Sequence, residues 1–416
     1  MKAMILAAGK GTRLQPLTRF QPKPMLTLLG RPVLDSIIEL LAGHGVRDII
    51  INTSHLASEI ENYFRDGSGR GIDIAYSFEG HLEGGTLHTR ALGSAGGMRK
   101  IQDFSGFFDD TFMVLCGDAL IDLDISAAVA EHRRRGALAT LVTKDVPRDE
   151  VHKYGVVVTD SDGRITAFQE KPDPRGALST TVNTGIYIFE PGIFEHIPAG
   201  REYDIGGQLF PDLVSKGLPF FATTLPFQWL DIGSLADYWH ANRLLLNAGY
   251  RGYPLPGKEV QPGVRAGSHV RANWDRIEIE GPVVIGNGSA IGDGARISGP
   301  TYIGTNCVIE PGARISECLL QDYTRIRAPA RLFQQIVSAG FCIQPDGAFV
   351  DCATTDLGWL IDNARRPKAA HAPHPDLLEA VTGRPCSMGL RPCSCWAGGA
   401  DSQAMRSTRP VNSNRA

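Results

Sequence analysis

The chain has 416 residues, more than one compact core usually holds, and this length predicts two or three domains. Hydrophobic residues make up 43% and charged residues 21%, which is typical of a soluble globular protein. The formal net charge of -3 excludes a general electrostatic attraction to nucleic acid or to an anionic membrane. Any anionic ligand must therefore be held by local basic groups.

The first apolar run, residues 3–8, is interrupted by a Gly-Lys-Gly turn and is too short for the core of a signal peptide. No apolar run approaches the length that crosses a bilayer. Five of the eight cysteines, between residues 116 and 352, lie in apolar or repeat contexts and are expected to be buried thiols. We therefore expect a cytoplasmic enzyme with no nucleic-acid or membrane partner.

Residues 1–250 alternate between short apolar runs and helical spacing. The alternation predicts an α/β domain with a doubly wound, mainly parallel sheet, whose ligands bind beyond the carboxyl ends of the strands. The loops after residues 7 and 116 are therefore the places where a site is expected. Strands are expected at 2–6, 48–52, 111–116, 137–143, 155–159 and 185–189, and helices at 33–41 and 57–64.

A Gly- and Pro-rich stretch at 251–263 is expected to be a linker. After it, isoleucine recurs every six residues from Ile279 to Ile315. This step does not match the 3.6-residue period of a helix, but it matches a left-handed parallel β-helix in which each hexapeptide forms one side of a coil. We expect this domain at 264–350, with a meander of ordinary strands as the alternative.

The last stretch, 365–416, is rich in Pro, Ser, Arg and Ala and is predicted to be a disordered tail. It contains Cys386, Cys393 and Cys395, with His371 and His374 nearby. Their spacing matches no standard zinc pattern, so a flexible tail is preferred over a metal site.

The turn after the first expected strand combines two glycines, a hydroxyl and two cations in Gly9-Lys10-Gly11-Thr12-Arg13. Glycines allow close approach of a phosphate chain, successive N–H groups form an anion-binding nest, and arginine can form paired hydrogen bonds with phosphate oxygens. The glycine spacing is neither that of a P-loop nor that of a dinucleotide fingerprint. A tight turn with solvated cations is the alternative for this motif alone.

Lys23 stands between Pro22 and Pro24, which restrict the backbone and so aim a long cation at one place. That arrangement suits a second phosphate contact. An exposed lysine in a proline turn is the alternative, and for this motif alone it is favoured.

Taken together, these motifs resemble the signature of the nucleotidyltransferases that make NDP-sugars, and further motifs of that family follow in order. The segments that carry the resemblance are 6–18, 22–25, 92–96, 116–118, 154–156, 170–172, 183–185 and 229–233. The resemblance covers about residues 1–350. Within the family, the Pro-Lys-Pro-Met element and the hexapeptide region look most like mannose-1-phosphate guanylyltransferases.

The resemblance implies a Rossmann-like mixed sheet of the nucleotide-diphospho-sugar transferase fold, followed by the β-helix. It also implies that a sugar-phosphate oxygen attacks the α-phosphorus of an NTP in line and releases pyrophosphate, with Mg²⁺ as cofactor. GTP and mannose 1-phosphate are the expected substrates; a glucose-1-phosphate thymidylyl-, uridylyl- or adenylyltransferase is the alternative. Such chemistry needs positioning and charge neutralisation more than a nucleophile.

The resemblance also implies roles for individual residues. The expected catalytic residues are Arg13 and Lys23. The expected nucleotide-binding residues are Ala7, Gly9, Gly11, Thr12, Arg13, Gly93 and Ser94. The sugar phosphate is expected at Gly155, Glu170, Lys171 and Asn183. The expected metal ligands are Asp118 and Asp231, whose alternatives are helix capping and a turn carboxylate; for Glu170 and Lys171 the alternative is a solvated pair.

One departure from the family pattern is an insertion, residues 80–91, between Glu79 and the expected nucleobase loop. It makes guanine selectivity less certain than catalysis, and its two histidines are expected to have no ligand role. The β-helix is expected to support a homo-oligomer. Two other classes remain open: a hexapeptide acyltransferase, for which His269 is the one histidine in the repeat region, and a non-catalytic regulatory subunit.

Overall fold

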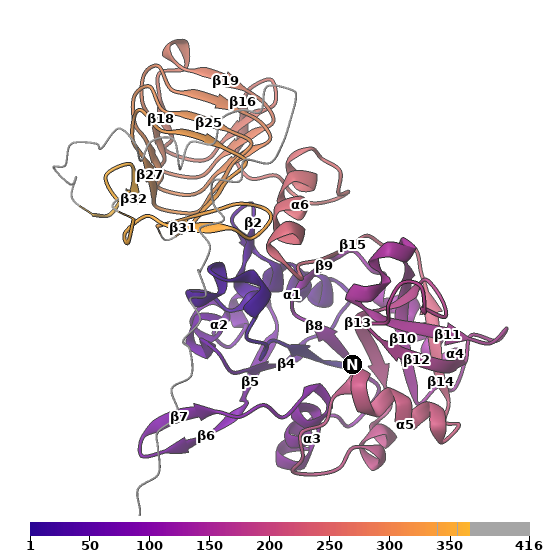
Figure 1. Ribbon diagram of the computed structural model, residues 1–416. Coiled ribbons are helices and arrows are strands. Elements are labelled where there is room, and N and C mark those ends of the chain that lie inside the picture. Colours follow the sequence, from indigo (N-terminus) through magenta and orange to yellow (C-terminus); the bar gives the residue numbers. More distant parts are fainter. Residues whose placement is uncertain (339, 356, 367–416) are drawn as a thin grey trace, which may run out of the picture.

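The structure is a computed structural model that describes residues 1–338, 340–355 and 357–366 (Figure 1). An α/β part is followed in the chain by a β-helix that stands on one end of it (Figure 1). Helix α6 (Leu235–Leu246) and strands β2 (Thr27–Leu28) and β31 (Phe349–Asp351) lie at the junction of the two parts (Figure 1).

The α/β part is built on a nine-stranded sheet whose main path is β12-β11-β13-β8-β1-β4-β5, with β10 and β14 joined to it through β13. Its strands are β1 (Lys2–Leu6), β4 (Asp48–Thr53), β5 (Asp73–Phe78), β8 (Phe112–Cys116), β10 (Ala139–Asp145), β11 (Gly155–Thr159), β12 (Ile165–Glu170), β13 (Thr181–Phe189) and β14 (Phe220–Thr224).

The sheet is mixed. Strands β8, β1, β4 and β5 are parallel neighbours, whereas β13 runs antiparallel to both β8 and β10. The Rossmann-like fold class is thereby confirmed, and the antiparallel strand β13 is the feature that the alternation of elements did not predict. The helices that accompany the sheet are α1 (Val33–Gly43), α2 (Ala57–Phe64), α3 (Ser94–Ser105), α4 (Ile125–Arg134), α5 (Phe210–Ser215) and α6.

The register of the central strands brings two loops together. Leu6 at the end of β1 pairs with Cys116 at the end of β8, and the N–H of Gly117 donates to the carbonyl of Leu6 at 3.0 Å. The three central residues of β1, Ala3 to Ile5, are fully buried because helices cover both faces of the sheet. The loops after residues 7 and 116 therefore begin side by side at the carboxyl edge.

A small antiparallel pair adds a third segment to that edge. Strand β15 (Trp229–Asp231) pairs with β9 (Ala119–Ile121), so that Asp231 lies opposite Ala119. The N–H of Ile232 donates to the carbonyl of Asp118 at 3.1 Å. Two turns that are more than 100 residues apart in the sequence thus become neighbours.

The insertion at residues 80–91 forms a hairpin of β6 (Gly80–Glu83) and β7 (Thr86–Thr89) that projects from the α/β part (Figure 1). Its base is closed by the N–H of Arg90, which donates to the carbonyl of Glu79 at 3.0 Å. The insertion therefore lengthens the connection to the expected nucleobase loop without disturbing the central sheet.

The hexapeptide region forms three stacked sheets with parallel pairing between successive coils, consistent with the predicted left-handed β-helix. Ile279, Ile297 and Ile315 are aligned on one sheet, 18 residues or three hexapeptides apart. The remaining isoleucines of the repeat fall in the same way on the other two sheets, and they fill the interior of the coil.

The first sheet of the β-helix consists of β16 (Lys258–Gln261), β17 (Val264–Ala266), β20 (Val283–Ile285), β23 (Thr301–Ile303), β26 (Leu319–Leu320), β29 (Ile336–Ser338), β30 (Phe341–Ile343) and β31. The second consists of β18 (Arg271–Ala272), β21 (Ala290–Ile291), β24 (Val308–Ile309), β27 (Thr324–Ile326) and β32 (Ile361–Asn363). The third consists of β19 (Glu278–Glu280), β22 (Arg296–Ser298), β25 (Arg314–Ser316) and β28 (Arg331–Phe333). Strand β16 begins inside the predicted linker, and β31 and β32 extend the β-helix sheets beyond residue 350.

Of the predicted tail, residues 367–416 lie outside the described residues, and with them Cys386, Cys393, Cys395, His371 and His374. Among the described residues, no helix combines the length and the hydropathy that a membrane span requires.

The two parts share one hydrophobic core. Tyr302, Leu319 and Phe341 of the β-helix belong to the same buried cluster as the apolar residues of β1, α1 and α6. Polar contacts reinforce it: the amide of Gln321 donates to the hydroxyl of Tyr238 at 2.6 Å, and that hydroxyl donates to the carbonyl of Thr27 at 2.8 Å.

A hairpin of the β-helix, formed by β30 and β31, also contacts the segment that follows residue 13, through Arg19. The guanidinium of Arg19 lies 5.6 Å from the ring centroid of Phe341 and 5.5 Å from that of Phe349, distances at which cation–π attraction acts. Lys23 lies between Arg19 and Thr27, which both contact the β-helix. The β-helix therefore restrains the lysine-bearing segment at two points.

The interior packing of the β-helix can be tested at Ile309, of which 1% is exposed. We expect Ile309→Ala to lower the free energy of unfolding by about 2–5 kcal/mol, because it removes buried methyl groups and leaves a cavity. Ile309→Val removes a single carbon and should cost only about 0.5–1.5 kcal/mol. Equal, small effects of both variants in denaturant unfolding would show that this side chain does not fill the coil.

Candidate active site

The loop of residues 9–13, which we call the phosphate loop, presents its backbone to solvent at the carboxyl edge of β1. Gly9, Lys10, Thr12 and Arg13 are exposed. Gly11 adopts a left-handed conformation, φ 61°, and a Cβ at this position would lie 2.9 Å from the side chain of Thr18. Only glycine fits there, so Gly11 fixes the shape of a turn whose neighbouring residues, Lys10 and Thr12, are exposed.

Ala7 is expected to contact the nucleotide, and its backbone N–H is hydrogen-bonded within the protein. That N–H donates to Oδ1 of Asn52 at 2.6 Å, and Nδ2 of Asn52 donates to Glu79 at 2.7 Å. Both side chains are buried, and burial raises the pKa of Glu79. These hydrogen bonds therefore hold the backbone at Ala7, just before the phosphate loop, in place.

Lys23 and Asp118 form an ion pair at the centre of the edge. Burial lowers the pKa of Lys23, but the nearby carboxylates of Asp118 and Asp231 outweigh that effect, so the pKa is raised overall and the side chain is charged. Both partners are largely buried, with 13% and 23% of their side chains exposed. The pair is therefore expected to hold its geometry better than a surface ion pair does.

Asp231 lies in the same group of charges. Burial and the neighbouring Asp118 raise its pKa to about 6, while Lys23 and Arg13 act in the opposite direction. Arg13 approaches this turn, since a Cβ at Gly233 would lie 2.9 Å from Oδ2 of Asp231 and 3.8 Å from Nη1 of Arg13. Four predicted residues, Arg13, Lys23, Asp118 and Asp231, are therefore brought together from four separate segments.

This donor set fits Mg²⁺. Two carboxylates that repel one another, as the raised pKa of Asp231 indicates, are relieved by a divalent cation. No group of three or more His, Cys, Asp or Glu side chains suited to hold a metal occurs within the described residues. Two carboxylates suffice for Mg²⁺, which commonly takes its remaining ligands from water and substrate phosphates.

The helices that Asp118 and Asp231 would cap, as the alternative to metal binding, are capped by other residues. Asp124 caps α4 by accepting from the N–H of Ala127 at 3.0 Å. Ser234 caps α6 through its hydroxyl, which accepts from the N–H of Asp237 at 3.2 Å. Asp118 and Asp231 are therefore not needed as helix caps.

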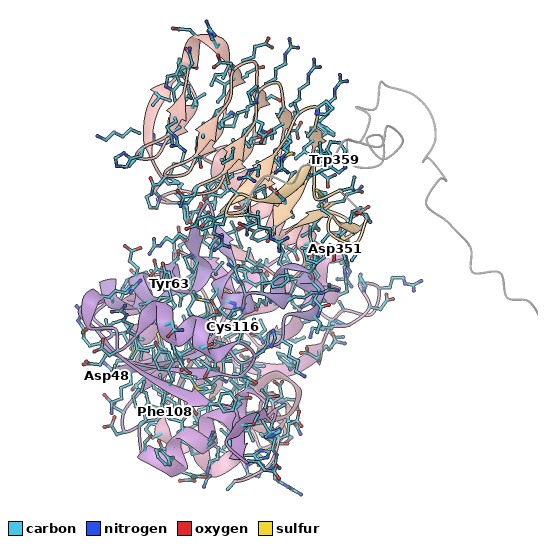
Figure 2. All side chains as sticks on the ribbon, turned by 90° about the vertical axis from the view of Figure 1, so that its left-hand side faces the viewer. Asp48, Tyr63, Phe108, Cys116, Asp351 and Trp359 are labelled. Carbon is cyan, nitrogen blue, oxygen red and sulfur yellow. The ribbon has the colours of Figure 1, made fainter. Side chains whose placement is uncertain are left out.

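Cys116 is the last residue of β8, within the α/β part and two residues before Asp118 (Figure 2). Burial raises the pKa of its thiol far above the ordinary range, so it is not a nucleophile. A Cβ at Gly185 would lie 2.7 Å from its sulfur. The glycine of the Asn183-Thr184-Gly185 motif is thereby required for close packing of β13 on β8.

The expected sugar-phosphate residues lie along β11, β12 and β13. Nζ of Lys171 is 2.9 Å from Glu170, and both side chains are about half exposed. The amide of Asn183 accepts from the N–H of Gly185 at 2.8 Å and donates to the hydroxyl of Tyr187 at 3.2 Å. Gly155 packs against the ring of Phe168, where a Cβ would lie 2.4 Å from the nearest carbon. Gly155 is thus required for packing.

Charged groups from both halves of the predicted site act on residues of β8 and β13. Burial raises the pKa of Tyr187, and Cys116, Asp204 and Glu170 contribute in the same direction. Besides burial, Asp118 raises the pKa of Cys116, whereas Lys23 lowers it. Strand β13, which carries Asn183, pairs with β8, which ends at Cys116.

The expected nucleobase loop begins α3. Gly93 has a positive φ of 71°, and a Cβ there would lie 2.5 Å from the carbonyl oxygen of Tyr203. The hydroxyl of Ser94 donates to Asp204 at 2.8 Å and accepts from the N–H of Ile205 at 2.8 Å. The Ser94 side chain therefore links two segments of the protein, while the backbone of the loop stays at the edge of the site.

Asn52, Asp204 and Tyr187 were not singled out from the sequence. Asn52 carried a usable signal, since it ends an apolar strand at the edge where ligands bind. Asp204 caps a short π-helix turn, residues 205–209, and no local pattern marks it as a neighbour of Ser94, 110 residues away. The loop histidines His81 and His88 stack on each other in the projecting hairpin, at a centroid distance of 5.5 Å.

The comparisons with known proteins agree with this arrangement. Residues 2–248 match the family model described as nucleotidyl transferase, and residues 282–317 match that of the bacterial transferase hexapeptide (six repeats). The chain is 54% identical, over 88% of its length and 94% of the relative, to a UTP–glucose-1-phosphate uridylyltransferase of Synechocystis sp.. It is 32% identical, over 71% of its length and 77% of the relative, to a mannose-1-phosphate guanylyltransferase of Mycobacterium tuberculosis.

A solved structure described as a putative glucose-1-phosphate thymidylyltransferase of Bacillus anthracis superimposes with a TM-score of 0.52. It covers 61% of this chain and 96% of its own, at 24% identity. This likeness concerns the fold of the α/β part.

The raised pKa of Asp231 generates a prediction about stability. Its pKa lies above the value of about 3.8 in the unfolded chain, so the metal-free fold is disfavoured by ionisation of this carboxyl. The penalty is absent below about pH 4, grows between pH 4 and 6, and is complete at neutral pH. Metal-free Asp231→Asn should therefore be more stable than wild type at pH 7, by about 1–2 kcal/mol after allowance for partial exposure.

The measurement is denaturant unfolding in EDTA at pH 4 and pH 7, with Asp118→Asn as the contrasting variant. Asp118→Asn leaves the buried ammonium of Lys23 with a weakened partner and should lose stability at pH 7. A wild-type protein that matches or exceeds Asp231→Asn in stability at pH 7 would contradict the assignment of Asp231 as an electrostatically unfavourable carboxylate.

Proposed function

The chain belongs to the nucleotidyl transferase family and is a sugar-1-phosphate nucleotidyltransferase, and from that premise we propose that it transfers the uridylyl group of UTP to glucose 1-phosphate. An oxygen of the sugar phosphate attacks the α-phosphorus of UTP, the bond to the β-phosphate breaks, and UDP-glucose and pyrophosphate are the products. Nucleoside triphosphate and sugar 1-phosphate are its substrate classes.

The observation that carries the proposal is a difference in similarity. The uridylyltransferase relative is 54% identical and is covered almost completely, β-helix included, whereas the guanylyltransferase relative is 32% identical. This difference favours the glucose-1-phosphate alternative over the first expectation of GTP and mannose 1-phosphate. The motifs shared by the whole family do not discriminate between the two pairs of substrates, because every member of the family needs them for an NTP and a sugar 1-phosphate.

The phosphate loop would hold the triphosphate through its exposed N–H groups, among them those of Gly9 and Thr12. Arg13 would neutralise charge on the departing pyrophosphate, and one such preorganised contact is typically worth about 3 kcal/mol. Lys23, charged and held against Asp118, would serve the α-phosphate. The reaction needs this preorganisation because there is no covalent intermediate to lower the barrier.

Members of the family generally use a divalent metal, and Asp118 and Asp231 would hold Mg²⁺ here. When bound, the ion supplies charge neutralisation and orientation of the α-phosphate. Lys23 must then share Asp118 with the ion. The ion pair thus holds the Asp118 side chain in place before substrates arrive.

The sugar phosphate would lie over β11–β13, with Lys171 on the phosphate and Glu170 and Asn183 on sugar hydroxyls. The exposed Glu170–Lys171 pair can separate at little cost to do so, because an exposed ion pair contributes little energy. The nucleobase would lie against the backbone of Gly93 and Ser94. The buried Asn52–Glu79 network would keep this loop and the start of the phosphate loop at a fixed separation, since Glu79 also accepts from the N–H of Leu92 at 3.4 Å.

Two other classes of function are less well supported. A silent regulatory subunit would be expected to lack part of the charged group, yet Arg13, Lys23, Asp118 and Asp231 are all present and adjacent. A hexapeptide acyltransferase needs a histidine base in a site, and His269 is exposed on a turn between β17 and β18.

The proposal is tested by assaying pyrophosphate release with each of four NTPs and with glucose 1-phosphate or mannose 1-phosphate in the presence of Mg²⁺. We expect UTP with glucose 1-phosphate to give the highest kcat/KM, and EDTA to abolish turnover. Asp118→Asn should abolish turnover. The matched control is Asp124→Asn, which alters the exposed carboxylate that caps α4 and should leave kcat unchanged.

Highest turnover with GTP and mannose 1-phosphate would replace the uridylyl assignment by the guanylyl one. Absence of turnover with every pair would exclude the enzyme function.

We further propose that the β-helix supports a homo-oligomer. Its first coil carries the edge strand β16, whose Val260 is 45% exposed, and an unpaired edge of this kind is suited to contact another subunit. Light scattering is expected to give a mass above that of the 45.0 kDa chain, and a monomer mass at micromolar concentration would remove the proposal.

A further inference from the structure

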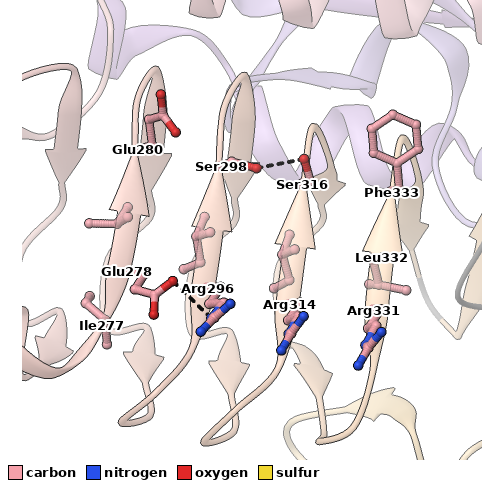
Figure 3. A pocket seen from close by; sticks show the side chains of 13 residues that line it. Ile277, Glu278, Glu280, Arg296, Ser298, Arg314, Ser316, Arg331, Leu332 and Phe333 are labelled. Carbon is pink, nitrogen blue, oxygen red and sulfur yellow. Dashed lines mark hydrogen bonds and ion pairs between the residues drawn. The ribbon is translucent and has the colours of Figure 1, made fainter. Parts of the chain in front are cut away.

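An open groove lies on the β-helix, away from the candidate active site (Figure 3). Its volume is about 820 Å³, and its floor is the four-stranded sheet β19-β22-β25-β28. None of the residues that line it belongs to the α/β part. The groove is therefore a feature of the repeat domain that the transfer reaction does not use.

Three arginines form a row across this groove, and we call them the arginine row: Arg296, Arg314 and Arg331 (Figure 3). They are in register on successive strands, since Arg296 pairs with Arg314 and Arg314 with Arg331. Neighbouring strands lie about 4.8 Å apart, so three like charges are held along about 10 Å. Like charges directly opposite each other on a sheet are destabilising.

The compensation of these charges is uneven. Arg296 forms an ion pair with Glu278 at 2.9 Å, on the first strand of the sheet. Within the described part of the chain, the side chains of Arg314 and Arg331 make no hydrogen bond or ion pair, and both are exposed. The end of the groove at β25 and β28 therefore carries two uncompensated positive charges.

A row of hydroxyls runs beside the arginines. Ser298 and Ser316 stand two residues after Arg296 and Arg314 on the same outward face, and their hydroxyls are 2.7 Å apart (Figure 3). Guanidinium groups give paired hydrogen bonds to phosphate oxygens, and serine hydroxyls can donate to the same oxygens. Cations spaced regularly along a groove of this length match a ligand with more than one phosphate group.

We propose that the arginine row is a binding site for a compound with two or more linked phosphate groups, held by Arg314 and Arg331 with help from Ser316. The ligand bridges adjacent coils of the β-helix and removes the repulsion between the two guanidiniums. Because the groove lies on the repeat domain, binding there leaves the transfer reaction's own residues untouched.

A second copy of the chain fits this face less well. The face carries Glu278 and Glu280 at one end, which could meet arginines of a partner, but the surface is hollowed. Two identical hollow faces cannot close on each other without leaving the hollow between them, whereas stable protein interfaces are closely packed. A phosphate compound fills the groove directly.

The test is isothermal titration calorimetry of the full chain with sodium tripolyphosphate at constant ionic strength. Wild-type protein is expected to bind tripolyphosphate at the groove and at the phosphate loop. Combined Arg314→Ala and Arg331→Ala substitutions should remove the groove component, weakening that binding at least about tenfold because two charge-assisted contacts are lost. The kinetics of nucleotidyl transfer without added phosphate should be unchanged in this variant.

The matched control is Arg271→Ala. Arg271 is an exposed β-helix arginine on β18, and the residues that follow it in register, Ala290 and Val308, are uncharged. Its removal should leave tripolyphosphate binding unchanged. Equal binding by wild type and the double variant would overturn the proposal, as would equal weakening by Arg271→Ala. Loss of a dimer in the double variant, with no tripolyphosphate binding at the groove in wild type, would assign the face to self-association instead.

Discussion

The parallel pairing of β1 with β8 is the constraint on which the rest of the site depends. It ends in register at Leu6 and Cys116, so the two loops that follow leave the sheet as neighbours, and the bond from Gly117 to Leu6 fixes their spacing. Lys23 on one side and Asp118 on the other can then form their ion pair. Both strands are central, since β1 lies between β4 and β8, and β8 lies between β1 and β13, so the ladder hydrogen bonds on both sides hold this edge in place.

The charged group at that edge is a compromise between stability and binding. Asp231 is held where burial and Asp118 raise its pKa, and Lys23 is held where only the two carboxylates keep its charge favourable. The two carboxylates and the two cations of this group do not neutralise one another fully. The group is therefore suited to bind a metal ion and phosphates, which would balance the remaining charges. The buried Asn52–Glu79 pair has the opposite character, since its hydrogen bonds are made within the protein and it serves to fix the frame of the site.

The β-helix contributes to this site at a distance. It shares a hydrophobic core with α1 and α6, and the guanidinium of Arg19 lies over two adjoining phenylalanine rings of its β30–β31 hairpin. The segment that carries Lys23 is therefore not a free loop, although it contains no long helix or strand of its own. A domain whose repeat pattern suggests only assembly thus also restrains a residue that the transfer reaction is expected to use.

The sequence by itself determined the elements with strong periodicity. Isoleucines every six residues specified the coils of the β-helix, because each must fill the same axis, and the apolar runs that end in glycine specified β1 and β8. The sequence also indicated Arg13, Lys23, Asp118 and Asp231 as candidate site residues, because each lies in a short motif that resembles one of the family. It did not determine the antiparallel strand β13, the linker residues that become β16, or the use of the Ala7 N–H by Asn52.

Those features were decided by the tertiary structure because each depends on a partner far away in the chain. Ser94 meets Asp204 across 110 residues, Asp231 reaches Asp118 through the β9–β15 pair, and Arg19 meets rings more than 300 residues later. Local patterns record what a residue can do, whereas its neighbours in space are fixed by packing and strand register. The phosphate loop could therefore be identified from its own sequence, whereas its position near the carboxylates of Asp118 and Asp231 became visible only in the folded structure.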